Sequence, residues 1–174
     1  MKIDSIDHKI LNILQNNARI TNVQLSHEVG LSPAPTLERV KKLESQGYIE
    51  SYHAVVNAER LGLGVLVYME LGLNINVDRD IQEFIDQLIA FPEVVECYHI
   101  TGEYDLLLKI YSTDLHSYQN FVMNQILRSV NVSKVNSKIV LSPVKRSMNL
   151  PMGLKTTAPQ PQPQPQPAPA KPKP

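Results

Sequence analysis

The chain has only one cysteine, Cys97, among its 174 residues. A single thiol cannot form an intrachain disulfide or a zinc site made of several cysteines, so both are excluded within one chain. The five histidines also lack the spacing of metal ligands. We therefore expect no metal site and no cofactor.

An excess of charge of one sign is also absent, because 17 Lys and Arg balance 17 Asp and Glu. Overall charge therefore does not indicate a nucleic-acid partner, and any positive patch facing DNA has to be local. Because phosphate neutralisation dominates DNA affinity, so weakly charged a domain is expected to act in several copies.

Long apolar runs are missing as well. No apolar stretch reaches the ~18 residues of a membrane span. The N-terminus has no basic segment followed by an apolar run, so it does not resemble a signal peptide. We expect a cytoplasmic protein that has no membrane partner.

Common catalytic motifs are absent too. The chain has no G-x-x-x-x-G-K-[ST], no G-x-S-x-G and no H-E-x-x-H. Nothing else in the sequence points to catalysis, and we expect that the protein is not an enzyme.

The most informative segment, residues 21–47, predicts two short helices joined by a tight turn. Thr21 and Gln24 form a T-x-x-Q capping box at the start of the first helix. Gly30 is placed to end that helix. Ser32 is a candidate cap for the second helix, with Pro33 at its first position. This pattern is typical of a helix-turn-helix, whose second helix enters the major groove in DNA-binding proteins.

The second helix is predicted to have two different faces. At 100° per residue, Leu37, Val40 and Leu43 share an apolar side, toward which Thr36 also projects. The opposite side contains Ala34, Pro35, Glu38, Lys41, Lys42 and Ser45, with Arg39 at its edge. The alternative is an ordinary amphipathic hairpin with a solvated polar face.

Three regions follow from the pattern along the chain. A first helix at about residues 5–15 completes a three-helix unit, and residues 48–57 alternate loosely like a strand. We predict a DNA-binding domain with a linker strand at residues 1–60, a second domain at 61–150 and a tail at 151–174. The Pro/Gln-rich tail is expected to be disordered, and a solvated spacer is favoured over an SH3-type ligand.

The second domain is predicted to follow the order β-α-β-β-α-β, a ferredoxin-like arrangement in an α+β protein. The expected strands are residues 65–73, 94–100, 105–111 and 132–141, and the expected helices are residues 77–91 and 115–127. Apolar residues occupy both faces of the sheet, with Leu106 and Leu108 on one side and Leu107 and Tyr111 on the other. Helices cover only one face, so two-fold self-association is the simplest way to cover the second; a ligand or another protein is the alternative.

The segment LSPAPTLERVKKLESQGYIESYHAVVN, followed by this unit with GEYDLLLK at its centre, closely resembles the Lrp/AsnC family of transcription regulators. The resemblance covers about residues 3–150. It implies a winged helix-turn-helix that binds double-stranded DNA and a RAM-type domain whose homodimers assemble into tetramers or octamers. A nucleoid-associated protein with an amino-acid effector bound between dimers would follow.

The resemblance also indicates site residues. The candidate DNA-binding residues are Asn22, Gln24, Ser32, Pro33, Ala34, Pro35, Glu38, Arg39 and Lys42, with Arg39 and Lys42 as the main contacts. Arg39 could instead pair with Glu38 or Glu28 inside the domain.

The candidate effector-binding residues are Gly102, Glu103, Tyr104, Asp105, Ser137 and Ile139. The turn at 102–105 could hold a carboxylate on its backbone N–H groups, while Asp105 pairs with an ammonium group. The alternative is a plain hairpin turn in which Asp105 accepts turn hydrogen bonds. The family's T-x-T pair reads Val135-Asn136-Ser137 here, so one hydroxyl is lost.

We therefore predict a sequence-specific regulator whose assembly or DNA affinity responds to an amino acid. Two alternatives remain open at the level of sequence. One is an architectural DNA-binding protein without an effector, favoured by the altered T-x-T pair. The other is an enzyme similar to the sirohaem decarboxylases, which the intact recognition-helix pattern argues against.

Overall fold

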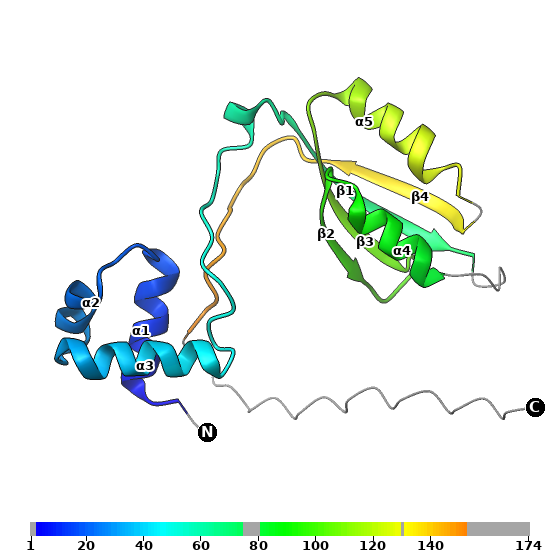
Figure 1. Cartoon of the computed structure of the whole chain (residues 1–174). Helices are drawn as coiled ribbons and strands as arrows, with labels where there is room; N and C mark the ends of the chain where they lie inside the picture. The colour runs from blue at the N-terminus through cyan, green and yellow to red at the C-terminus, as the bar shows by residue number, and fades with distance from the viewer. Residues whose placement is uncertain (1–2, 75–80, 130, 153–174) are drawn as a thin grey trace, which may run out of the picture. The chain divides into compact units, whose positions relative to one another are not determined.

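The computed structural model describes residues 3–74, 81–129 and 131–152 (Figure 1). The chain forms two compact units. The first runs to His53 and resumes at Ser147, and the second is Ala54–Arg146. The chain thus leaves the first unit, forms the second, and returns.

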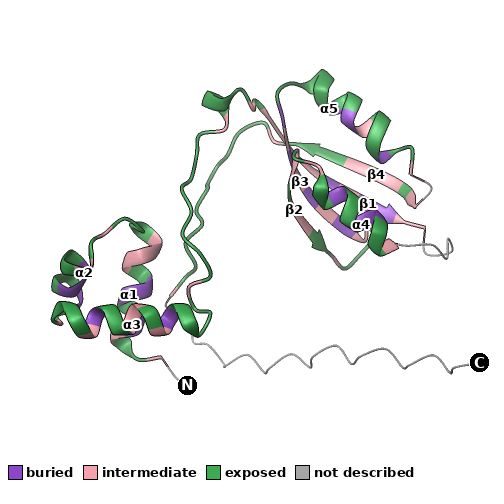
Figure 2. Ribbon diagram, viewed as in Figure 1, coloured by how far each residue is buried: buried purple, intermediate pink, exposed green. Residues whose placement is uncertain are grey.

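The first unit contains the three predicted helices, α1 (Ser5–Asn16), α2 (Asn22–Val29) and α3 (Pro33–Ser45). Their core consists of Ile10, Leu11, Leu25, Val29 and Leu43, all buried (Figure 2). Helical spacing gives each helix an apolar stripe, and burying these stripes against one another holds the unit together.

The N-caps of α2 and α3 lie at the predicted residues, but only α2 has side-chain cap bonds. Thr21 and Gln24 make both bonds of the predicted capping box, at 3.2 and 3.1 Å. Ser32 lies at the N-cap of α3 in an extended conformation, but its hydroxyl makes no cap bond. A cap oxygen accepts from the second or third helical N–H, and the third residue here is Pro35, which has none. Ser32 is therefore the N-cap residue of α3, as predicted, but its side chain makes no cap bond.

The predicted strand at residues 48–57 is wrong. Helix α3 ends in a Schellman motif, in which Tyr48 N–H donates to the Leu43 carbonyl at 2.9 Å and Gly47 N–H to that of Glu44 at 3.0 Å. The chain beyond is not a strand, and Val55 and Val56 are 71% and 61% exposed. An extended segment becomes a strand only when it finds a ladder partner, and loose alternation does not supply one.

The second unit has the predicted β-α-β-β-α-β order. Its strands are β1 (Val65–Leu73), β2 (Val94–His99), β3 (Leu106–Ser112) and β4 (Val132–Ile139), and its helices are α4 (Ile81–Ala90) and α5 (Leu115–Phe121). Helix α5 continues as a π-helix, η2 (Val122–Ile126), and a 3₁₀ turn, η1 (Glu59–Leu61), precedes β1. The strands form an antiparallel sheet in the order β2-β3-β1-β4. The predicted start of α4 at residue 77 lies outside the described residues.

Both helices pack on the same face of the sheet. There, Met69, Leu71 and Leu108 are fully buried against Phe84 and Phe121. Ile89, which follows the buried Leu88 on α4, is 53% exposed.

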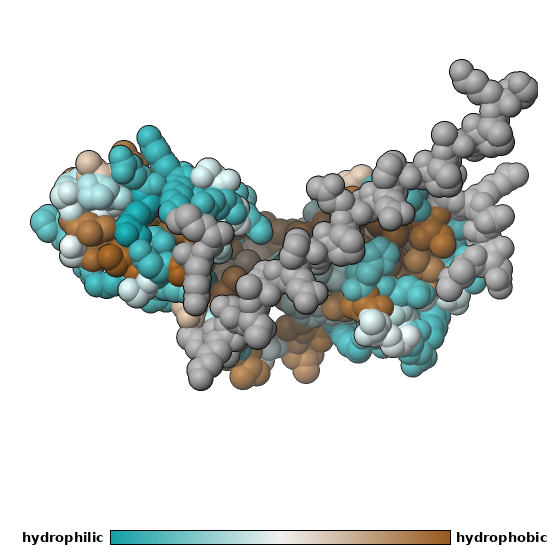
Figure 3. Space-filling view, turned by 90° about the horizontal axis from the view of Figure 1, so that it is seen from below, coloured by the Kyte–Doolittle hydropathy of each residue, from teal (hydrophilic) through white to brown (hydrophobic). Residues whose placement is uncertain are grey.

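The other face is not covered by helices and is mixed in character. Leu107 and Tyr111 are half-buried, and the ion pairs Lys109–Glu96 and Lys138–Glu70 lie beside them. Hydrophobic and hydrophilic groups both reach the molecular surface (Figure 3). No helix in the described part of the chain is long and apolar enough to span a bilayer.

Candidate functional site

A side-chain bond fixes the turn between α2 and α3. The Asn22 amide donates to the carbonyl of Pro33 at 2.8 Å, which ties the start of α2 to the start of α3. Asn22 is therefore a structural link, whatever else it contacts. The N-terminal end of α3 presents Ser32, Pro33 and Ala34 to solvent.

The exposed face of α3 is centred on Ala34, Glu38 and Lys41, at positions i, i+4 and i+7. Lys41 is exposed and Lys42 only half-exposed, so the structure presents a basic side chain that the site prediction omitted. Pro35 is half-buried as well. This face thus combines the small residue Ala34 with one acidic and one basic group, and the exposed Leu37 lies beside it.

The predicted core face of α3 is partly wrong. Leu37 is 42% exposed, whereas Thr36 is completely buried, as its predicted direction required. The Thr36 hydroxyl donates to the Ser32 carbonyl at 3.0 Å, which removes the cost of burying it. The inner stripe therefore runs through Thr36, Val40 and Leu43, and Leu37 lies about 60° from Val40, the nearest of the three.

Arg39 does not point outward as predicted. Its Nη1 atom lies 2.8 Å from Asp4 Oδ2 and 2.7 Å from Asp7 Oδ1. Arg39 is thus paired inside the domain, although with these carboxylates instead of Glu38 or Glu28. The reason is the capping box that starts α1, which places two aspartates opposite this side of α3.

The electrostatics of this cluster are mutual. A backbone hydrogen bond from Asp7, and then the Arg39 guanidinium, lower the pKa of Asp4. The hydrogen bonds to Asp4 and Asp7 raise the pKa of Arg39 further. Arg39 therefore remains charged and joins α3 to the start of α1.

The turn at residues 102–105 lies between β2 and β3. Gly102 has φ of +120°, a conformation that favours glycine. Asp105 is bonded to β1: its Oδ2 accepts from Leu73 N–H at 2.7 Å, and its own N–H donates to the Leu71 carbonyl at 2.9 Å. The carboxylate thus satisfies the end of a neighbouring strand.

A lysine from a distant strand completes this turn. Lys134 Nζ lies 3.0 Å from Glu103 Oε1 and 4.5 Å from the ring centroid of Tyr104. Lys134 pairs with Gly72 in the β1–β4 ladder. Sequence reasoning missed it because it lies 31 residues from Glu103, and only the strand register brings the two together.

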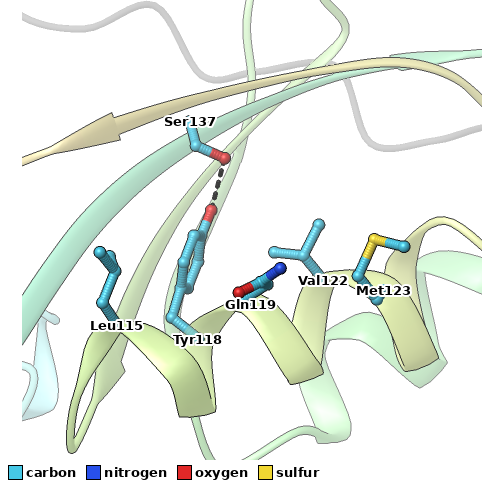
Figure 4. Close-up of a pocket in the computed structure, with 6 residues that line it drawn as sticks. All are labelled: Leu115, Tyr118, Gln119, Val122, Met123 and Ser137. Carbon is cyan, nitrogen blue, oxygen red and sulfur yellow. Dashed lines mark hydrogen bonds between the residues drawn. The ribbon is translucent and has the colours of Figure 1, made fainter.

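Ser137 lies elsewhere, in a cavity of about 280 Å³ between α5 and β4 (Figure 4). The cavity is lined by Leu115, Tyr118, Gln119, Val122, Met123 and Ser137. The Ser137 and Tyr118 hydroxyls are 2.5 Å apart, and burial raises the pKa of Tyr118. Ile139 is 47% exposed and does not line the cavity.

The predicted effector residues therefore form two groups. Ser137 faces the helices and forms one group. The turn at 102–105 forms the other, and Lys134, three residues before Ser137 on β4, reaches this turn across the other face of the sheet. Three strand residues span about 10 Å. One amino acid could not contact both groups of a single chain, so a site using both needs two copies.

The comparisons with known proteins agree with the division of the chain into a helix-turn-helix unit and a second unit. The winged helix-turn-helix DNA-binding family matches residues 3–50, and the Lrp/AsnC ligand-binding-domain family matches residues 66–150. The leucine-responsive regulatory proteins of Klebsiella pneumoniae and Escherichia coli K12 are each 38% identical over 148 residues, which cover 85% of this chain and 90% of theirs.

Solved structures show the same relationship. A transcriptional regulator of Neisseria meningitidis, solved in complex with L-Met, is 36% identical with a TM-score of 0.83, covering 87% of this chain and 98% of that one. Escherichia coli AsnC is 28% identical with a TM-score of 0.76, covering 85% and 99%. The matched relatives are regulators, which argues against the enzymatic alternative. The chain belongs to the Lrp/AsnC family of DNA-binding transcription regulators, which join a helix-turn-helix to a ligand-binding domain.

Proposed function

We propose that this regulator binds specific DNA sites as a homo-oligomer and that an amino acid bound to the second unit changes its assembly or its DNA affinity. The observation that carries this proposal is the joining of a complete helix-turn-helix to a ligand-binding unit whose candidate site residues lie on two sides of one sheet.

The DNA contacts are proposed on the exposed face of α3. Ala34 and Ser32 allow close approach to the groove, Glu38 can accept from a base edge, and Lys41 can reach a base or a phosphate. The predicted contacts also include Lys42, which is half-exposed, and Asn22, which is bonded to the Pro33 carbonyl. Arg39 acts by holding the helix in place, because its guanidinium is engaged by Asp4 and Asp7.

The assembly is proposed to start from the uncovered face of the sheet. Leu107 and Tyr111 there would be buried by a second copy, while the Lys109–Glu96 ion pair on the same face would fix the register. Tetramers or octamers built from such dimers would present several weakly charged helix-turn-helix units together. Dimers that bind palindromes would require half-sites about one helical turn, or roughly 34 Å, apart.

The effector is proposed to lie between copies, near the turn at 102–105 of one and the cavity beside Ser137 of another. Leu115, Val122 and Met123 make that cavity largely apolar, which suits an aliphatic or thioether side chain. The complex of the Neisseria meningitidis relative with L-Met supports an effector of this class.

An effector-independent architectural role is the second candidate. It is favoured by the Ser137 hydroxyl, which Tyr118 already engages, and by Glu103, which Lys134 already engages. Calorimetry of the full chain against the twenty amino acids separates the two roles. Binding of one or a few apolar amino acids is expected; no binding by any of the twenty would leave only the architectural role.

A further inference from the structure

We infer that Lys134 binds the α-carboxylate of the amino-acid effector and that Glu103 occupies this lysine until the effector replaces it. The inference rests on the proposed amino-acid response and adds to it a specific cation and a competing group of the chain itself. Neither residue's pairing could be deduced from the local sequence.

The path of the Lys134 side chain is the first support. Lys134 comes from β4, and its ammonium group reaches the turn before β3, so the side chain crosses β1, which lies between these strands. It crosses at Gly72: a Cβ atom there would lie 2.7 Å from Lys134 Cγ and 2.9 Å from Cε. A glycine at this point therefore allows the lysine to lie flat over the backbone and reach the turn.

The contacts of the ammonium group are the second support. The Glu103 side chain is 75% exposed and that of Lys134 is 40% exposed. Ion pairs exposed to this degree contribute little stability, so another carboxylate can replace Glu103 at small cost. Tyr104 lies under the ammonium group and would keep it in place during the exchange.

The neighbouring carboxylate makes the arrangement suited to a zwitterion. Asp105 uses Oδ2 for Leu73 N–H, and its Oδ1 has no partner among the residues that the structure describes. Asp105 and Lys134 flank β1 from its two sides at Gly72 and Leu73. Lys134 would receive the carboxylate of an amino acid and Asp105 its ammonium group.

The same strand provides a matched control. Lys138 pairs with Glu70 on the same face, but Asn136 also donates to that carboxylate, at 2.8 Å. Glu70 is thus held by two side chains and is only 17% exposed, so this pair is not free to exchange. Replacing Lys138 removes the same charge from the same strand without touching the turn.

The experiment is calorimetry on the full chain with the amino acid that the wild type binds and with its primary amide, which lacks the carboxylate charge. We expect Lys134→Met to weaken binding of the acid at least about tenfold and to abolish the preference for the acid over the amide. Glu103→Gln should tighten binding about threefold to fivefold, because the competing carboxylate is gone. Lys138→Met should bind like the wild type.

Three results would overturn the inference while leaving the proposed function in place. One is unchanged binding by Lys134→Met, another is no gain from Glu103→Gln, and the third is equal weakening by Lys134→Met and Lys138→Met. Sedimentation of each variant shows whether weaker binding only follows a lost oligomer, and that finding would also overturn it. If the wild type binds none of the twenty amino acids, the proposed amino-acid response fails together with the inference.

Discussion

Replacing Arg39 by alanine should destabilise the helix-turn-helix unit, because this residue joins two of its helices. The Asp7 side chain is 8% exposed, and its carboxylate receives a hydrogen bond from Arg39 at 2.7 Å. Without the guanidinium, that buried charge keeps one backbone donor, the Asp4 N–H at 3.1 Å. The loss therefore combines a broken charged bond with a poorly compensated buried carboxylate.

The size of the effect follows from these contacts. A hydrogen bond to a charged group contributes about 1.5–3 kcal/mol, and a buried pair broken on one side costs more. The Arg39 side chain is 31% exposed, so solvent screens part of the interaction. We expect the free energy of unfolding to fall by about 2 kcal/mol.

A double-mutant cycle with Arg39→Ala and Asp7→Asn, followed by urea denaturation, tests this interpretation. The two changes should be non-additive by about 1 kcal/mol or more, because each removes the same contact. Lys41→Ala on the exposed face is the control and should change stability by less than about 0.5 kcal/mol. Equal stability of Arg39→Ala and Lys41→Ala, or additive changes in the cycle, would refute the reasoning.

Three further outcomes are expected. If Lys41 contacts a base, Lys41→Ala should weaken binding to a selected DNA site by roughly 1–3 kcal/mol in anisotropy titrations. If it contacts a phosphate, the change should weaken binding to all sequences alike. Unchanged affinity for both the selected site and random DNA would mean that this face does not contact DNA. Hydrogen bonds from Lys138 and Lys109 lower the pKa of Glu70 and Glu96, respectively, below their ordinary 4.5. The stability that these two ion pairs provide is therefore present above pH 4.5 and is lost as the pH falls through the folded-state pKa values. Urea titrations at several pH values should show that Glu96→Gln loses less stability on acidification than the wild type does. Partial burial and then the hydrogen bond to Glu44 raise the pKa of Tyr52 to about 12; Glu44→Gln should lower it in a phenolate absorbance titration, and an unchanged value would mean that this bond is not formed in solution.

Much of the fold could be predicted from local patterns. The bounds of β1 agree with the alternation of residues 65–73, and the capping box at Thr21 marks the start of α2, because both signals depend only on neighbouring residues. Helical spacing also placed Thr36, Val40 and Leu43 on the inner side of α3, but it could not show that Leu37 is largely exposed. Hydropathy alone places Leu37 inside, whereas Thr36 is buried because a backbone carbonyl satisfies its hydroxyl.

The candidate sites depended more strongly on contacts distant in sequence. Arg39 was recognised as important, but its direction depends on carboxylates 32 and 35 residues away. Lys134 is found only from the register of β4 against β1. The strand predicted at 48–57 required a pairing partner, which no local pattern can supply.

The most direct test of the account measures the affinity of the full chain for a DNA site selected by the protein itself, and for random DNA, with and without each amino acid at constant salt. The account predicts that the selected site binds at least about 10³-fold more tightly than random DNA. It also predicts that at least one apolar amino acid changes the affinity for the selected site by about 5-fold to 150-fold. Equal affinity for the selected and random DNA would contradict it. An affinity for the selected site that none of the amino acids changes would contradict it as well.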